Sequence, residues 1–161
     1  MSQQMISIGV ALVITWQAAV CERKIVQAAK MALAITASGN PTDPRWDASK
    51  KQLLQLVREG IAINPHYRKI TPIVADEVAR WGDWTNATWI WESVIASRPY
   101  VVAIISNVAR GYSSLGDHAK ANAYMERAKR IQPDAPSVRS LEVVLVARRG
   151  EEARANEMAM Y

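Results

Sequence analysis

Two histidines, one cysteine and two pairs of neighbouring carboxylates are the residues of this sequence whose types could support catalysis or bind a metal. They are His66, His118, Cys21, Asp76 with Glu77, and Glu151 with Glu152. Each histidine falls near an expected turn, without acidic or cysteine ligands at the spacing of a metal site. Neighbouring carboxylates on a helix diverge and cannot share one reacting centre. A single cysteine cannot form an intrachain disulfide or a thiolate cluster. We therefore expect no enzyme activity from this chain, and neither a metal nor another cofactor.

Four tryptophans form the densest aromatic cluster of the sequence: Trp81, Trp84, Trp89 and Trp91. Trp84 and Trp91 take bulky packing positions of the repeat described below, which predicts that they are core residues. An exposed indole can stack on a sugar ring or insert into a protein partner. Trp81 and Trp89 are therefore the candidate aromatic surface.

A second candidate site consists of polar residues on the outward faces of the first helices of the expected hairpins. Asn107 and Arg110 are three residues apart, and their amide and guanidinium groups can bind a carboxylate or a backbone segment. The alternative is an ordinary solvated helix face. The wider set comprises Lys69, Asp76, Arg80, Ser106, Asn107, Arg110, Ser114 and Arg148. Of these we expect Lys69, Arg80, Asn107, Arg110 and Arg148 to form a groove that binds a partner protein or peptide.

The formal net charge is +5, with Lys and Arg scattered among Asp and Glu. The densest basic clusters are residues 127–130 and 148–149, and no stripe of base-stacking aromatic residues accompanies them. Such clusters are usually solvated helix faces, so we expect no nucleic-acid partner.

The elements that must position these residues are expected to be helices. Half of the residues are hydrophobic and 22% are charged, with few glycines, no phenylalanine, and long stretches of Ala, Leu, Ile, Val, Arg and Glu. This composition predicts an all-α fold.

The amino-terminal part predicts a membrane-associated helix. Met5 to Val20 contains no charge, and Trp16 lies near its end, where an interfacial aromatic residue would sit. Its length is just under the roughly 17 to 25 residues of a complete crossing. A buried helix of the domain is the alternative, whereas a cleaved signal peptide is disfavoured because the first four residues lack a basic charge.

The second half of the sequence repeats itself at a constant spacing of about 34 residues, which we call the repeat period. The three series are Pro65, Pro99 and Pro133; Gly82, Gly116 and Gly150; and Ala87, Ala121 and Ala155. They predict a helix, a tight turn after each glycine, a second helix, and a turn marked by proline. In the clearest unit the first helix gathers Ile105, Val108, Ala109 and Tyr112 on one face, and the second supplies Ala121, Tyr124, Met125 and Ala128. Small alanines let the two axes approach, and the hairpin leaves another face for its neighbour, so the units should stack.

This pattern resembles the tetratricopeptide repeat (TPR) family. The resemblance covers residues 68–133 well and extends backward to residue 43 as a lone second helix. It weakens after residue 133, because Arg139 and Glu142 fall on positions that are apolar in the preceding unit. We therefore expect the next first helix to be shifted and to use Val138, Leu141 and Leu145. The chain stops inside an expected second helix, so this end is either a truncation or a surface that a partner or second copy covers.

A hydrophobic segment ending in tryptophan, a helical linker and an irregular repeat array together resemble the carboxyl-terminal region of bacterial O-antigen ligase and protein O-oligosaccharyltransferase membrane proteins. The resemblance implies a bacterial inner-membrane location with periplasmic repeats. The charges that follow Val20 favour the cytoplasmic alternative. In that family the catalytic groups belong to a membrane body that is absent here, so no catalytic residue is carried over.

The sequence therefore predicts a hydrophobic helix over 1–24, a helical linker and loop over 25–41, and a TPR-like domain over 42–161. The expected function is that of a noncatalytic protein-interaction or scaffold module tethered to a membrane. The alternative is the terminal repeat portion of a glycan-transfer enzyme.

Overall fold

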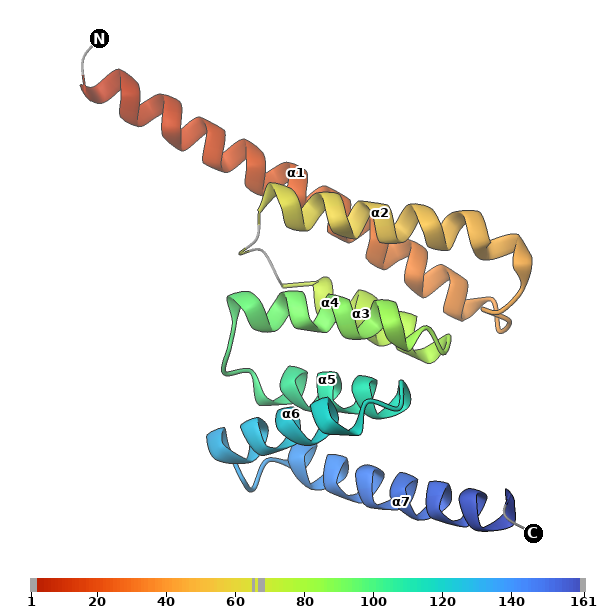
Figure 1. The fold of residues 1–161 in the computed structure, drawn as a ribbon. Coiled ribbons are helices and arrows are strands. Elements are labelled where there is room, and N and C mark those ends of the chain that lie inside the picture. The colour runs from red at the N-terminus through yellow and green to blue at the C-terminus, as the bar shows by residue number, and fades with distance from the viewer. Residues whose placement is uncertain (1–2, 65, 67–68, 160–161) are drawn as a thin grey trace. The chain divides into compact units, whose positions relative to one another are not determined.

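The structure is a computed structural model that describes residues 3–64, 66 and 69–159. Within these residues it contains seven α-helices, one 3₁₀ helix and no strand, which confirms the predicted all-α class (Figure 1). Pro65 and Arg68, which the sequence placed at a repeat junction, lie outside the described residues. The chain divides into two compact units, residues 1–82 and 83–161.

The first unit contains α1 (Gln3–Ala37), the 3₁₀ helix η1 (Pro44–Trp46), α2 (Asp47–Ile63) and α3 (Thr71–Arg80). α1 packs against both α2 and α3. The Lys24 ammonium contacts Glu59 Oε2 at 2.7 Å and ties α1 to α2. The buried apolar residues of α1 are Cys21, Ile25, Ala28, Ala29, Ala32 and Ile35, and those of α2 are Leu53 and Val57.

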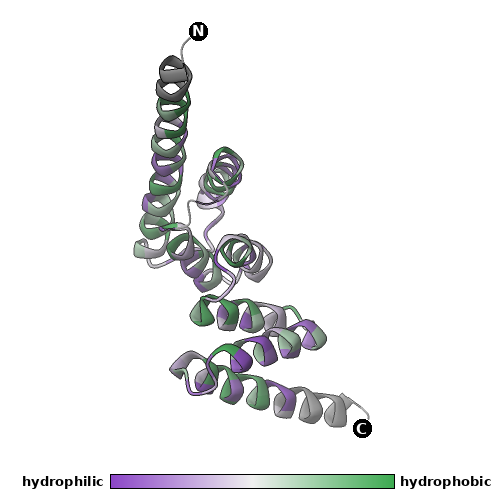
Figure 2. Ribbon diagram, turned by 90° about the vertical axis from the view of Figure 1, so that its left-hand side faces the viewer, coloured by the Kyte–Doolittle hydropathy of each residue, from purple (hydrophilic) through white to green (hydrophobic). Residues whose placement is uncertain are grey.

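α1 is one continuous helix, and it covers both the segment predicted as membrane-associated and most of the predicted linker. Hydrophobic residues dominate much of its length (Figure 2). Large apolar side chains on its amino-terminal part are exposed, namely Val10, Leu12, Val13, Ile14 and Trp16. The crossing considered for Met5 to Val20 is not found: in the part of the chain that the structure describes, no helix is both long enough and apolar enough to span a membrane.

The second unit contains α4 (Trp84–Ser97), α5 (Val102–Ser114), α6 (His118–Ile131) and α7 (Pro136–Ala159). α5 is the central helix, because it packs against α4, α6 and α7. Its apolar face is buried, as the spacing of Ile105, Val108 and Ala109 predicted. Opposite it lie the buried side chains of Ile90, Trp91, Val94, Ala121, Ala128, Val138, Leu141 and Leu145.

Helix boundaries recur at the repeat period that the sequence shows. α2, α4 and α6 end at Ile63, Ser97 and Ile131, while α3 and α5 end at Arg80 and Ser114. The turns after α3 and α5 contain Gly82 and Gly116, whose φ angles of 83° and 77° are in the left-handed region that favours glycine. The predicted turns at these two glycines are confirmed.

An aspartate after each of these glycines begins the next helix. Asp83 accepts a hydrogen bond from the Asn86 amide at 3.1 Å, and Asp117 accepts one from the Lys120 amide at 3.0 Å. Each carboxylate satisfies one of the amides that a helix start leaves without a partner. The glycine ends one helix, and the aspartate starts the next.

The third glycine of the series does not mark a turn. α7 runs through Gly150 without interruption, so the break that the repeat predicted at this point is wrong. The residue after Gly150 is Glu151, where the two earlier turns have aspartate. Glutamate is not among the preferred helix-capping residues, and the alanines, arginine and glutamates that follow favour continuation of the helix.

Candidate functional site

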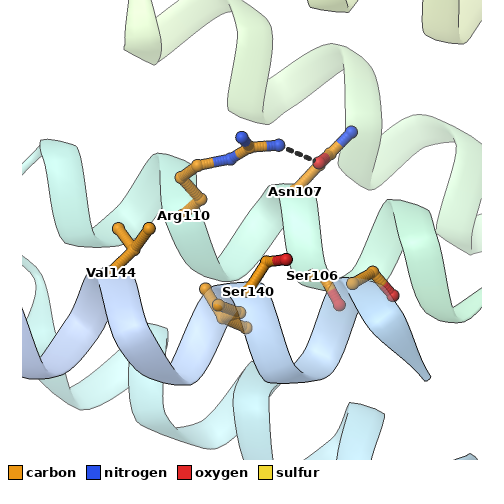
Figure 3. A pocket seen from close by; sticks show the side chains of 7 residues that line it. Ser106, Asn107, Arg110, Ser140 and Val144 are labelled. Carbon is orange, nitrogen blue, oxygen red and sulfur yellow. Dashed lines mark hydrogen bonds between the residues drawn. The ribbon is translucent and has the colours of Figure 1, made fainter.

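A groove with a volume of about 260 Å³ lies between α5 and α7, both in the second unit (Figure 3). α5 contributes Ser106, Asn107 and Arg110, and α7 contributes Ser137, Ser140, Leu141 and Val144. We call it the α5–α7 groove.

Helical spacing explains why these side chains share the groove. On α5, Ser106 and Asn107 each precede Arg110 by about one turn, so all three lie on the side of α5 next to the face that the core buries. The apolar positions of α7 are shifted relative to those of α5, so that Val138, Leu141 and Leu145 are buried, as the sequence predicted. Because of this shift, Ser137, Ser140 and Val144 lie on the side of α7 that lines the groove.

Every polar side chain of the groove has at least one hydrogen-bond donor. The Arg110 guanidinium donates to Asn107 Oδ1, so the two side chains hold each other along α5 (Figure 3). Among the described residues that line the groove, Arg110 is the one with a charge. An arginine held in a fixed position is a ready partner for a carboxylate.

Ser106 has an unsatisfied hydroxyl in this groove. Its side chain is 4% exposed, and its Oγ is buried without a hydrogen-bond partner in the described structure. A buried hydroxyl without a partner is unfavourable by about 1–3 kcal/mol. Because Ser106 Oγ has almost no exposed surface, a ligand atom can reach it only if the side chains around it move. Ser137, from the first turn of α7, lines the same groove. The positive end of the helix dipole favours a negative charge there.

A second polar cluster joins α4, α5 and α6. Glu92 Oε1 accepts hydrogen bonds from the hydroxyls of Tyr112 at 2.7 Å and Tyr124 at 3.0 Å. The two tyrosine rings stack with centroids 5.7 Å apart, and the Lys120 ammonium lies 4.8 Å from the Tyr112 centroid. Burial, followed by the hydrogen bond to Glu92, raises the pKa of both tyrosines above the usual value. The cluster keeps both phenols protonated and links three helices.

No model of a known protein family matches the chain, and a search of curated proteins finds no match to it. The functional interpretation therefore depends on the residues and the geometry of the chain itself.

The structure brings together only part of the predicted groove. Asn107 and Arg110 line it, whereas Arg148 lies on α7 one turn beyond Val144 and does not. Lys69 and Arg80 belong to the first unit, where Arg80 contacts Glu77 Oε1 at 2.8 Å. Sequence reasoning missed Ser137, Ser140 and Val144. The signal that could have found them was the shifted apolar face of α7, because residues beside that face on the α5 side must line any gap between the two helices.

The tryptophans have different surroundings. Trp91 is only 1% exposed, which confirms its predicted place in the core, while Trp84 and Trp89 are half-buried. Trp81 is also half-buried, and its Nε1 donates to Thr36 Oγ1 at 2.8 Å. The Lys50 ammonium lies 5.6 Å from the Trp81 ring centroid. The Trp81 indole thus already has partners within the first unit, which makes it a weaker candidate for a binding surface than the sequence suggested.

Among the described residues, no three His, Cys, Asp or Glu side chains gather closely enough to hold a metal ion. His66 is exposed in a turn, and His118 is the first residue of α6.

Proposed function

We propose that this chain is a noncatalytic protein-interaction module built of TPR-like helical hairpins, and that its α5–α7 groove binds an extended segment of a partner protein that carries a carboxylate. The single observation on which the proposal depends is the groove itself, where Arg110 is held beside Asn107 and next to the buried Ser106 hydroxyl.

The recurrence of helix ends supports the TPR-like interpretation. Helices end one repeat period apart, and two of the turns share a left-handed glycine followed by a capping aspartate. The period matches that of the tetratricopeptide unit, in which one helix and a turn lead to a second helix. Repeats of this kind usually act by presenting a surface to a partner.

The groove has separate places for two parts of a peptide. Arg110 and Ser137 supply donors for carboxylate oxygens, and the positive end of α7 adds to the attraction. Leu141 and Val144 provide an apolar wall for an aliphatic side chain. A segment with an acidic and an aliphatic residue near each other matches this arrangement.

The mechanism that we propose is positioning without chemistry. A module that holds a partner raises the effective concentration of that partner near whatever the module is attached to. Association of the exposed apolar part of α1 with a membrane stays a prediction, and binding in the α5–α7 groove does not depend on it.

An Arg110→Gln variant tests the proposal, with Arg130→Gln as the matched control, because Arg130 is an exposed arginine on α6 outside the groove. Proteins captured from the native cell extract by the wild type would be identified by mass spectrometry, and an acidic peptide of the main partner would then be titrated by fluorescence anisotropy. We expect Arg110→Gln to weaken binding about tenfold or more, since it removes a charge-assisted contact of about 1.5 kcal/mol or more. The Arg130→Gln variant should bind like the wild type. Equal partner sets and affinities for both variants would place the binding site elsewhere.

A further inference from the structure

A second groove of about 150 Å³ lies between α6 and α7. It is lined by Met125 and Lys129 of α6 and by Glu142, Leu145, Val146 and Arg149 of α7. We call it the α6–α7 groove. Two large apolar residues of α7 are exposed here: Val146, which lines the groove, at 66%, and Val143 at 70%. By helical spacing this groove and the α5–α7 groove are on different faces of α7.

The preceding repeat shows what normally fills such a groove. One repeat earlier, α6 packs on α5, and its Tyr124 stacks on Tyr112 and donates a hydrogen bond to Glu92 of α4. Val146 comes one repeat period after Tyr112, so it takes the position that α6 covers on α5. The α6–α7 groove is therefore equivalent to a surface that a helix occupies one repeat earlier, and a helix is the occupant that fits it.

One segment of the sequence has the pattern of such a helix. Residues 151–161 follow α6 at the repeat period, and their Ala155 corresponds to Ala121. Ala121 is nearly fully buried, next to Tyr112 in the core of the second unit. The segment contains three glutamates and one arginine. Of the two cations of the α6–α7 groove, Lys129 pairs with Glu142 and Arg149 donates to Asn122 Oδ1.

This segment cannot reach the α6–α7 groove of its own chain. α7 continues as one helix from Pro136 to Ala159, and the groove residues Leu145, Val146 and Arg149 belong to that same helix. A helix that does not break at Gly150 carries the segment onward along its axis, away from the groove. The segment must then come from another molecule.

We propose that the occupant is a second copy of this chain: two α7 helices pair in antiparallel orientation, and the part of α7 that follows Gly150 in each copy lies in the α6–α7 groove of the other. Such a pairing is self-complementary, so it closes as a two-fold dimer. It buries Val143 and Val146 of both copies. It leaves the α5–α7 groove to the partner protein and does not depend on the function proposed for that groove.

The first test is sedimentation velocity of the full chain over a wide concentration range. We expect a monomer–dimer equilibrium, which Val146→Glu should weaken by about tenfold or more because it introduces a charge at the centre of the contact. Tyr100→Glu is the control, since Tyr100 is an exposed apolar residue in the turn between α4 and α5. A wild type that is monomeric at every concentration overturns the proposal, as does a dimer that Val146→Glu leaves unchanged. A circular dichroism melt checks that each variant is folded.

The second test identifies the segment in the groove. In a Cys21→Ala background, Val146→Cys and Ala155→Cys proteins would be prepared separately, mixed and oxidised. We expect a disulfide-linked dimer of unlike chains, whereas Tyr100→Cys mixed with Ala155→Cys should not cross-link. If the Val146→Cys, Ala155→Cys double variant instead forms an internal disulfide and stays monomeric, α7 folds back on itself and the proposal is wrong. Absence of any cross-link between the unlike chains also contradicts it.

Discussion

Thr88 on α4 and Gly111 on α5 form a close helix contact in the second unit. A Cβ atom placed on Gly111 would lie 2.0 Å from Thr88 Oγ1 and 3.2 Å from Thr88 Cβ. Both Thr88 atoms are close to the backbone of α4, so the hydroxyl can move away only by rotation of the side chain or a shift of the helix. The absence of a side chain at Gly111 therefore sets how near the two axes come.

We predict that Gly111→Ala destabilises the protein by about 1–3 kcal/mol, because the added methyl group overlaps Thr88. Gly150→Ala is the matched control: a Cβ there meets no atom within 4 Å, and alanine favours a helix interior over glycine by about 0.5–1 kcal/mol. Thermal unfolding of dilute protein should thus show a lower Tm for the first variant and an equal or higher Tm for the second. A Gly111→Ala variant as stable as the wild type would mean that α4 and α5 are further apart.

At the scale of the elements, the cluster of Glu92, Tyr112 and Tyr124 holds α4, α5 and α6 together. Both tyrosine hydroxyls donate a hydrogen bond to Glu92, and a phenol can donate only while it is protonated. Burial and the hydrogen bond to Glu92 raise the pKa of each tyrosine in the folded protein above its usual value of 10.0. The stabilisation is therefore complete below pH 10 and is lost as the pH rises above that value, because the unfolded chain gives up its protons first.

We predict that the wild type loses stability steeply above about pH 10, and that the double variant Tyr112→Phe, Tyr124→Phe loses less over the same interval. At neutral pH the double variant should be less stable, since Glu92 loses two donors, each worth roughly 1 kcal/mol or more. The exposed Tyr100 supplies the control, because Tyr100→Phe should follow the wild-type curve. Urea unfolding followed from pH 7 to pH 11 measures these differences, and parallel curves for all three proteins would show that the cluster does not couple protonation to folding.

The turns between elements follow from local chemistry. Gly82 with Asp83 and Gly116 with Asp117 each end one helix and start another, as the sequence predicted. Gly150 belongs to the same series, yet α7 passes through it. A glycine alone permits a left-handed turn but does not require one, and without a capping residue after it the next helix has no favoured start.

At the scale of the whole molecule, the boundary between the compact units follows Gly82, between two helices that the sequence assigned to one hairpin. Each unit has its own buried apolar residues. In α1 these begin at Cys21, and the described large side chains before it include exposed Leu12, Ile14 and Trp16. The carboxyl-terminal half of α1 thus contributes the packing, and we expect the fold to depend little on the residues before it.

We predict that deletion of residues 1–20 leaves the helical structure of the remaining chain intact, with a change in Tm of only a few degrees. The ion pair of Lys24 with Glu59 and the contacts of Ile25 and Ile35 remain in the shortened protein. Circular dichroism melts of the two proteins make the comparison, and sedimentation with lipid vesicles measures whether the deletion also removes membrane association. Unfolding of the shortened chain would show instead that the amino-terminal part of α1 is buried, as in the alternative interpretation of the sequence.

The sequence by itself determined the helical class, the ends of most helices, and the faces of α5 and α7 that are buried. These features follow from local interactions: apolar residues at helical spacing, glycines in left-handed turns and capping aspartates act within a few residues. Only the tertiary structure decided which polar residues share a groove. Neighbouring residues on a helix differ by about 100° in direction, so the rotation of α7 against α5 settles that Ser137 and Ser140 face Arg110 while Arg148 lies beyond them. Lys69 and Arg80 fit the same sequence pattern, but Lys69 precedes α3 and Arg80 ends it, and both belong to the other unit.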